Sequence, residues 1–332
     1  MKAANWPRRP LPTDKLLVLD AKTQAWVDRH AADLPDQLQP GDLLVVNDAA
    51  TLPGSLHGHA VGQPIELRLH GQTAQGHWLG LLFGAGDWHQ PTELRPPPPL
   101  LQPGDAVDFG ALQATVVAVD GRVLTVAFAV GAAQFWQALH AVGHPVQYSY
   151  LQRALGLHEV QTGYAGPAVA AEMPSAGRIL TAAMLARLHQ RGIAVATLTH
   201  AAGLSSTGDA ALDATLPWPE RYTLPATTIA AIAKAKRVIA VGTTVVRALE
   251  DCQLRHGKLV AGAHLATLVL GPQTQLRVVH GVLSGMHDVD SSHFGLLTAF
   301  APLALLRAAT AHATQVGYLQ HEFGDACLVW GR

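Results

Sequence analysis

Residues 238–250 read VIAVGTTVVRALE, an apolar run that passes through a single glycine into an amphipathic segment. The apolar run is typical of a buried strand, Gly242 permits a tight turn, and a helix is predicted from Thr244 to Leu254. The same alternation surrounds this stretch, with predicted helices at 178–190 and 227–236 and predicted strands at 193–198 and 265–270. Strands separated by helices at this spacing indicate crossover connections and therefore a largely parallel sheet covered by helices.

A second pattern interrupts this α/β pattern. The chain begins with two short predicted strands, 16–19 and 43–46, and a helical piece between them. From about residue 58 to residue 142 most regular segments alternate apolar and polar residues, and Asp120-Gly121 joins two of them, which is a strong hairpin signal. The sequence therefore predicts an α/β domain built from residues 1–57 and 151–332, interrupted by a small inserted β-barrel domain at 58–150.

Composition narrows the class of protein. The 332 residues are 49% hydrophobic and 14% charged, and the formal net charge of -1 gives no global basic field that would attract nucleic acid. Cys252 and Cys327 are too few for a disulfide framework and fit no zinc-ligand spacing. No export signal is visible, and the apolar run at 300–306 is far shorter than the ~20 residues that a bilayer requires. We expect a cytoplasmic globular protein that does not enter a membrane, with the oligomeric state left open.

Polar residues follow several of the predicted strands. They are Asn47-Asp48, Thr199-His200 and Gly242-Thr243-Thr244, whereas the fourth strand end, Gly271-Pro272, is not polar. Ligands bind outside the carboxyl ends of parallel strands because loop groups and helix N-termini converge there. The sequence therefore predicts a binding site at this edge of the sheet.

The segment after Gly242 has two interpretations. In the first, a threonine caps the helix, free N–H groups receive a carboxylate or phosphate oxygen, and Arg247 lies about one turn in, on the same face as Glu250. In the second, the segment is a capped turn with a local ion pair and no ligand. His200, at a strand end, is a candidate proton carrier near neutral pH, and a structural hydrogen bond explains it equally well.

The 18 histidines form no recognisable metal motif. His57 and His59 are one close pair and His287 and His293 another, but neither pair has a zincin or zinc-finger spacing. The chain also lacks the glycine-rich motifs of dinucleotide and P-loop nucleotide sites. We therefore expect no bound metal and neither of these two nucleotide sites.

Several segments, taken in order, resemble one known family. They are residues 41–48 (GDLLVVND), 160–165 (VQTGYA), 174–177 (PSAG), 241–250 (VGTTVVRALE) and 323–326 (FGDA). In this order they span nearly the whole chain and resemble the S-adenosylmethionine:tRNA ribosyltransferase-isomerase family of queuosine biosynthesis. The fold of that family, an α/β domain interrupted by a β-barrel, agrees with the organisation predicted above.

The resemblance implies that S-adenosylmethionine is a co-substrate, used in an unusual way. The family transfers and isomerises its ribosyl group to preQ1-modified tRNA, which gives epoxyqueuosine and releases adenine and methionine, with no metal required. A base removes a proton from C5′ beside the sulfonium, adenine leaves, and an amine of the modified base attacks C1′. Such a site needs a proton carrier, a clamp for the methionine carboxylate and groups that hold adenine and ribose.

The resemblance also implies site residues, position by position. It implies that His200 and Glu250 are catalytic. It implies that the substrate is bound by Asn47, Asp48, Gln161, Tyr164, Thr199, Gly242, Thr243, Thr244, Arg247, His287 and Asp325. S-adenosylmethionine is then the expected ligand of the polar strand ends, and tRNA is the implied partner.

The family pattern changes in the motifs expected on the acceptor side. Ile179 stands where the family has a histidine, Glu172-Met173 precedes the PSAG segment, and residues 284–293 (SGMHDVDSSH) replace the family's TNFHLPxSTL motif. Glu220 and His287 are retained. Three hypotheses follow: the family reaction on preQ1-modified tRNA, transfer from S-adenosylmethionine to another acceptor such as a small amine or a different base, and a non-catalytic binding paralogue.

The near-neutral charge and the altered motifs predict weak binding of tRNA. Lys and Arg must offset the phosphates of an anticodon loop, and log affinity then falls with log salt by about 0.7 per single-strand contact. We expect lower affinity than in a typical family member, with any basic patch formed by Arg8, Arg9, Arg95, Arg153 and Arg178. Titration of preQ1-containing and unmodified tRNA at two salt concentrations measures this. Tight binding that prefers preQ1 would contradict the altered-acceptor hypothesis.

Overall fold

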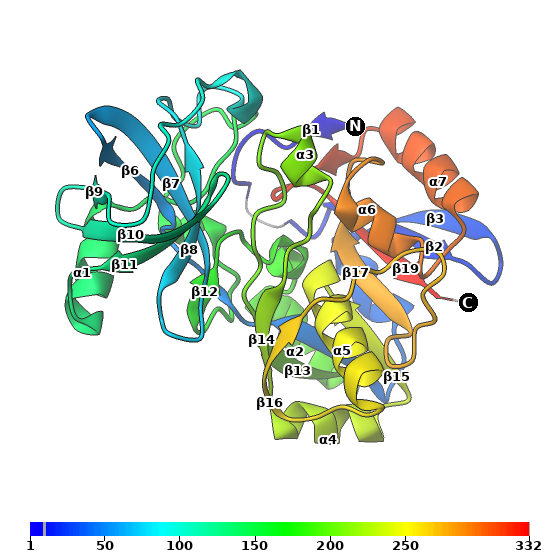
Figure 1. Ribbon diagram of the computed structural model, residues 1–332. Coiled ribbons are helices and arrows are strands. Elements are labelled where there is room, and N and C mark those ends of the chain that lie inside the picture. The colour runs from blue at the N-terminus through cyan, green and yellow to red at the C-terminus, as the bar shows by residue number, and fades with distance from the viewer. Residues whose placement is uncertain (9–10, 332) are drawn as a thin grey trace.

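The computed structural model describes residues 1–8 and 11–331. Figure 1 shows a β body, with one labelled helix beside its strands, on one side of the molecule and an α/β body on the other. The β body is one continuous segment of the chain, whereas the α/β body contains both chain ends, coloured blue and red. The predicted fold class, an α/β domain interrupted by an inserted β-barrel, is confirmed.

One sheet organises the α/β body, and in the described residues its strands follow the order β16-β14-β13-β4-β15-β17-β19-β2-β3. Its centre is parallel and consists of β13 (Ala194–His200), β4 (Asp42–Asn47), β15 (Arg237–Val241) and β17 (Gly281–Gly285). The outer strands are β14 (Glu220–Leu224), β16 (Gly262–Ala266), β19 (Ala326–Trp330), β2 (Lys15–Asp20) and β3 (Ala25–His30). Of the outer pairs only β19 and β2 run parallel. The sheet is therefore mixed, and the expected parallel arrangement describes mainly its centre.

Helices cover both faces of this sheet because the central strands present apolar residues to both faces. In β4, Leu43 and Val45 belong to one hydrophobic core and Leu44 and Val46 to another. The first core takes in α4 (Ala226–Lys234), α5 (Thr243–His256), α6 (Ser292–Leu297) and α7 (Leu303–Gln315), and the second takes in α2 (Ala182–Gln190). Among the described residues, no helix has both the length and the apolar character needed to span a bilayer.

The inserted module is a closed barrel. Its strands follow the order β10-β11-β8-β7-β6-β9, with β6 (Ser55–Ala60), β7 (Gln63–Gln72), β8 (Trp78–Phe83), β9 (Ala106–Asp108), β10 (Gln113–Asp120) and β11 (Val123–Phe128). The hairpin at Asp120-Gly121 is confirmed, with Asp120 paired to Val123. Phe135 and Leu139 of α1 (Ala132–Val142) complete the barrel core. The limits 58–150 for this domain stay a prediction, and β6 begins at Ser55, before the first of them.

Two sequence-based expectations for the α/β body were wrong in detail, and one strand was not predicted. The helical piece before residue 43 is present as a 3-10 helix, η1 (Ala31–Gln37), but β3 before it was not predicted, because its exposed edge position leaves no apolar alternation to detect. The helix predicted at 178–190 is divided because the Thr181 hydroxyl accepts a hydrogen bond from the Met184 N–H and starts α2 there. The strand predicted at 265–270 ends at Ala266.

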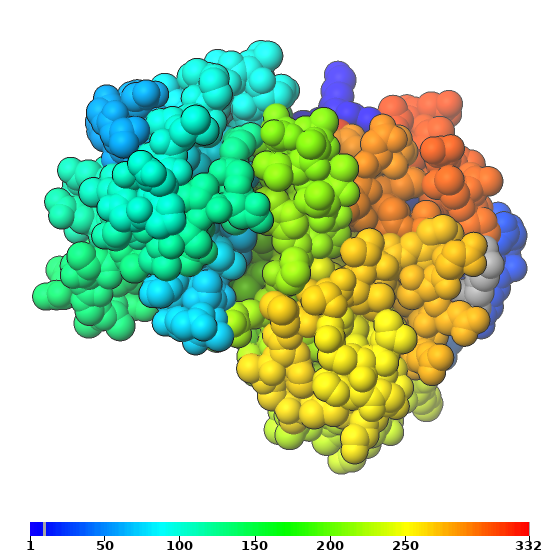
Figure 2. Space-filling model, in the orientation of Figure 1, coloured from blue at the N-terminus to red at the C-terminus, as the bar shows by residue number. Residues whose placement is uncertain are grey.

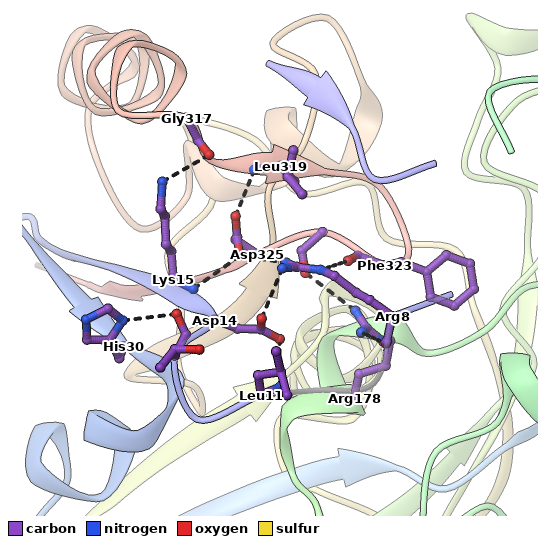
Figure 3. A network of polar contacts seen from close by, with 12 residues as sticks. Arg8, Leu11, Asp14, Lys15, His30, Arg178, Gly317, Leu319, Phe323 and Asp325 are labelled. Atoms are coloured by element: carbon purple, nitrogen blue, oxygen red, sulfur yellow. Dashed lines mark hydrogen bonds and ion pairs between the residues drawn. The ribbon is translucent and has the colours of Figure 1, made fainter. Parts of the chain in front are cut away.

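A polar network joins the N-terminal segment to the last strands (Figure 3). Asp325 accepts hydrogen bonds from Arg8 Nη2 at 2.6 Å, from the Lys15 N–H at 3.1 Å and from the Leu319 N–H at 2.8 Å. Beside it, β1 (Lys2–Ala3) pairs with β18 (Leu319–Gln320). Asp325 is 4% exposed, so its carboxylate is a buried anchor that holds the two chain ends together.

Replacing this anchor is expected to destabilise the fold. Asp325→Asn keeps the size of the side chain but turns one acceptor into a donor, which then faces either Arg8 and the Lys15 N–H or the Leu319 N–H. Loss of hydrogen bonds to a charged group should cost about 1.5–3 kcal/mol of unfolding free energy, measured by urea denaturation. Asp36→Asn, at an exposed ion pair with Arg191, is the control and should cost less than about 1 kcal/mol. Equal stability of the two variants would contradict the anchor role.

Candidate functional site

A cleft of about 430 Å³ lies at the carboxyl edge of the central strands. Residues that follow β13, β15 and β17 line it, together with the segment that enters η4 (Ser175–Ile179) and the turn after β18. The stretch 202–217, which carries α3 (Ala210–Asp213), forms one wall, and Figure 2 shows this part of the chain, coloured yellow-green, between the barrel and the α/β body. The volume falls in the range of small-molecule sites.

The start of α5 contributes hydrogen-bond donors to the cleft. Gly242 occupies the N-cap position at φ +95°, a conformation that favours glycine, and Gly242, Thr243 and Thr244 all line the cleft. Within the described residues no side chain caps this helix, so the expectation that a threonine does so was wrong. The N–H groups of the first turn are therefore available to an anionic group.

Arg247 lies one turn further along α5 and is 3% exposed. Its guanidinium pairs with Glu220 and donates to the backbone carbonyls of Leu268 at 2.9 Å, Trp218 at 2.8 Å and Ala266 at 3.2 Å. The side chain touches the cleft, but these contacts occupy most of its donors. They favour a structural role, and the substrate contact implied by resemblance stays a prediction.

His200 is completely buried behind the cleft wall. Its Nε2 atom lies 3.6 Å from Glu220 Oε2, and neither ring nitrogen has a hydrogen-bond partner among the described residues. Burial lowers the pKa of His200, which favours the neutral ring. Glu220 lines the cleft and His200 is not among its lining residues, so the geometry supports a positioning role for His200 better than direct contact with a substrate.

The polar residues at the ends of β4 and β13 bind one another. Asn47 Nδ2 donates to the His200 carbonyl at 2.9 Å, and the His200 N–H donates to Asn47 Oδ1 at 2.8 Å. The Thr199 hydroxyl donates to Asp48 Oδ1 at 2.6 Å. These side chains fix the strand ends at the site edge without lining the cleft, so their substrate contacts stay predictions.

Three other residues implied by the resemblance have local partners. Gln161 makes two hydrogen bonds to the backbone of Thr51, at 2.9 and 3.0 Å, which joins η3 (Leu157–Val160) to β5 (Ala50–Thr51) beside β12 (Ala168–Ala170). The Tyr164 hydroxyl packs so closely on Gly177 that a Cβ there would lie 1.9 Å away. Asp325 holds the terminal network of Figure 3. Each contact is structural.

Glu250 lies on the side of α5 away from the cleft. Its carboxylate accepts hydrogen bonds from the backbone N–H groups of Arg277, Val278 and Val279, each at 2.9 Å. A carboxylate with three such donors holds the loop before β17 in place. The geometry therefore does not support the catalytic role that the resemblance implies for Glu250.

His287 is the residue of the implied set that combines a ring in the cleft with a fixed orientation. Its Nε2 atom lies 2.7 Å from the hydroxyl of Ser284, which is 1% exposed at the end of β17. In the described part of the chain no hydrogen bond reaches Nδ1. The His293 ring lies 5.0 Å away, and burial lowers the pKa of His287 well below its ordinary value. Burial therefore favours the neutral ring, and Nδ1 is the ring nitrogen that faces no protein donor among the described residues.

Several residues that line the cleft were not predicted as site residues. They include Glu172, Ser284, His293, His321 and Glu322. The available signal was their position: Glu172 and residues 284–293 fall where this chain departs from the family pattern, and His321-Glu322 directly precedes the FGDA segment. Within the described residues, no three His, Cys, Asp or Glu side chains are grouped to hold a metal ion.

The arginines proposed for a basic patch do not gather on the surface. Arg95 is buried against Glu66, and Arg178 is 9% exposed and donates to the carbonyls of Arg8 and Glu322. Arg8 pairs with Asp14 and Asp325, and Arg153 pairs with Glu159. Arg9 lies outside the described residues. The expected patch was therefore wrong for the four described members.

Comparison with known proteins assigns the family. A model of the queuosine biosynthesis protein family matches residues 2–329. The chain belongs to this family. It is 32% identical to the S-adenosylmethionine:tRNA ribosyltransferase-isomerase of Synechococcus elongatus, covering 95% of this chain and 89% of that protein. It is 33% identical to the protein of the same name from Gloeobacter violaceus, covering 98% and 92%.

A solved structure supports the same fold. The crystal structure of S-adenosylmethionine tRNA ribosyltransferase from Thermotoga maritima is 22% identical in sequence and superposes with a TM-score of 0.52. The match covers 98% of this chain and 95% of that chain. Both the α/β body and the inserted barrel therefore belong to an arrangement already seen in this family.

The contacts of Arg247 predict how its removal acts. Arg247→Met leaves Glu220 without its charge partner beside the buried His200, so unfolding free energy should fall by about 3–5 kcal/mol in urea denaturation. Adding Glu220→Gln should recover part of that loss, because the stranded charge is removed. Native-like stability combined with lost affinity for S-adenosylmethionine would instead restore the substrate clamp implied by the resemblance.

Proposed function

We propose that this protein is an S-adenosylmethionine-dependent ribosyltransferase-isomerase that acts on preQ1-modified tRNA, giving epoxyqueuosine and releasing adenine and methionine. The observation that carries the proposal is the cleft at the carboxyl edge, where an uncapped helix N-terminus and a histidine fixed by a buried serine share one cavity. Family membership and the names of the relatives support it. A cytoplasmic location is part of this proposal, because the proposed acceptor is a tRNA.

The N-terminus of α5 is proposed to bind the methionine carboxylate. Its first N–H groups carry the positive end of the helix dipole, and Thr243 and Thr244 add two hydroxyl groups at the same place. Gly242 lets the backbone approach a ligand without a Cβ in the way. Backbone N–H and hydroxyl donors thus converge at this place in the cleft, which favours an anionic carboxylate there.

His287 is proposed to remove the C5′ proton. The sulfonium acidifies this C–H bond, the proton passes to Nδ1 of the neutral imidazole, and the electron pair stays on C5′ beside the sulfur. If Nε2 carries the other proton, it donates to Ser284 Oγ, which holds the ring while Nδ1 accepts. His200 and Glu220 are then positioning residues in the wall, since His200 is buried behind Glu220.

A second candidate is transfer from S-adenosylmethionine to another acceptor. The burial of Arg95 and Arg178 favours it, because these side chains are not available to the phosphates of a tRNA. The two candidates share the donor site and differ only in what attacks C1′.

The products decide between the candidates. Incubation with S-adenosylmethionine and preQ1-modified tRNA, followed by mass spectrometry, should give adenine, methionine and tRNA whose modified base has gained the ribosyl-derived group. Adenine and methionine that form only with a small amine or another base would favour the second candidate. S-adenosylhomocysteine would indicate methyl transfer and contradict both.

Replacing the proposed base should slow the reaction without abolishing binding. His287→Gln keeps a polar group near Ser284 but has no ring nitrogen to take the proton, so the single-turnover rate of adenine release should fall about 10²- to 10⁴-fold. The dissociation constant for S-adenosylmethionine, measured by calorimetry, should change much less. His189→Gln, on the exposed face of α2, is the matched control. A rate for His287→Gln close to that of the control would remove His287 from this role.

A further inference from the structure

Three aromatic rings stack in a row that ends in the cleft. The rings of Tyr148 and Tyr150 have centroids 6.1 Å apart and planes at 13°, and those of Tyr150 and His321 have centroids 4.4 Å apart and planes at 14°. Tyr148 and Tyr150 belong to the segment that leaves the barrel, whereas His321 follows β18 and lines the cleft. We name this row the Tyr148–Tyr150–His321 stack. It brings a flat ring, fixed from behind, to the cleft.

The backbone holds His321 in an unusual conformation. Its φ is +70°, in the left-handed region that residues other than glycine seldom adopt. The His321 carbonyl accepts from the Gly324 N–H at 2.9 Å, and its ring Nε2 lies 3.9 Å from Asp288 Oδ2. The side chain is 30% exposed. A strained residue whose ring is only partly covered, at the edge of a cavity, is typical of a binding position.

Two carboxylates lie beside the stack and also line the cleft. The Tyr150 hydroxyl donates to Glu322 Oε2, and the Tyr148 hydroxyl donates to Glu172 Oε1. The Ser205 N–H donates to the same Glu172 oxygen at 3.0 Å. In the described part of the chain neither carboxylate pairs with a lysine or arginine, and the second oxygen of each has no hydrogen bond. Burial raises the pKa of both, and the charge of Glu322 raises that of Glu172 further.

These two features select a class of ligand. A planar base can stack on the outer face of a fixed aromatic ring, and such stacking tolerates any base. The carboxylates add selectivity, because a ligand that presents donors stabilises their ionised form, which only accepts hydrogen bonds. A guanine-type base presents two neighbouring donors, N1–H and the exocyclic amino group, whereas adenine presents an acceptor, N1, beside its amino group. Donors on the ligand would also offset the buried negative charge.

We propose that the His321 ring together with Glu172 and Glu322 forms the subsite for a guanine-type acceptor base that carries an amine. The base stacks on His321, its donor edge or its amine binds the carboxylates, and the N-terminus of α5 holds the co-substrate elsewhere in the same cleft. This inference rests on the proposed function, because the base is the acceptor of that reaction. The residues assigned to the acceptor either differ from the family pattern or lie outside the segments that resemble the family.

Binding of the free preQ1 base to the full-length protein tests the subsite without turnover. By calorimetry, His321→Ala should weaken binding of the base about 5- to 100-fold through loss of stacking, and His321→Phe should restore most of it. Glu322→Gln, which leaves the backbone of His321 unchanged, should also weaken it. The dissociation constant for S-adenosylmethionine should stay within about 2-fold in all three, as should both constants in the control His189→Ala on α2.

The outcomes separate this inference from the proposed function. Variants that weaken binding of S-adenosylmethionine instead of preQ1 would assign this subsite to adenine or to the methionine ammonium and overturn the inference. Wild-type protein that does not bind the preQ1 base, or His321→Ala that binds it normally, would also overturn it. Binding that depends on His321 and Glu322 would support the inference even if no adenine and methionine form, and that failure would count against the proposed function alone.

Discussion

Arg247 carries a buried positive charge at the point where α5 meets the wall of the cleft. A buried cation is stable only when acceptors surround it, and here Glu220 and several backbone carbonyls from residues 217–218 and 266–268 do so. Those acceptors lie on the wall and at the end of β16. Satisfying one charge therefore fixes the wall, brings Glu220 to His200 and sets the position of the helix whose first turn lines the cleft.

The barrel contributes to the site through the segment that leaves it. A small hydrophobic cluster containing Leu81, Phe83 and Leu204 joins the barrel to the α/β body. Behind it, Arg68 lies 4.4 Å from the Phe83 ring and 5.6 Å from that of Tyr148. Burial alone would raise the pKa of Glu66, but Arg68 and Arg95 lower it to about 2, so this carboxylate stays charged. The stack that enters the cleft thus starts from a rigid, ion-paired support.

Different parts of the fold line the cleft, and they offer different chemical groups to a ligand. The start of α5 offers N–H and hydroxyl donors, whereas the turn after β18 and the segment before η4 offer the carboxylates of Glu322 and Glu172. A co-substrate that carries a carboxylate and an acceptor that carries donor groups have different preferred ends of such a cavity. His287, fixed by Ser284 on β17, lines the same cavity between strand ends of the sheet.

Local patterns in the sequence determined the elements and the family. The apolar runs of β4 and β15 and the glycine at 242 predicted the parallel centre, because a buried strand, a tight turn and a helix each have a local signature. The antiparallel edge strand β3 was not predicted, because its exposed residues show no regular alternation of apolar and polar side chains. The strand-end rule likewise indicated the edge of the sheet at which the cleft lies.

Only the tertiary structure decided which polar residues are available to a ligand. Asn47, Asp48 and Glu250 stand at predicted positions, yet backbone groups and neighbouring side chains distant in sequence occupy them. His321 and Glu322 carry no local signal, because their place in the cleft depends on contacts with residues 148–150 that lie far away in the chain. The sequence specifies the type of each side chain. Whether that side chain still has donors or acceptors available to a ligand depends on partners that only folding brings within reach.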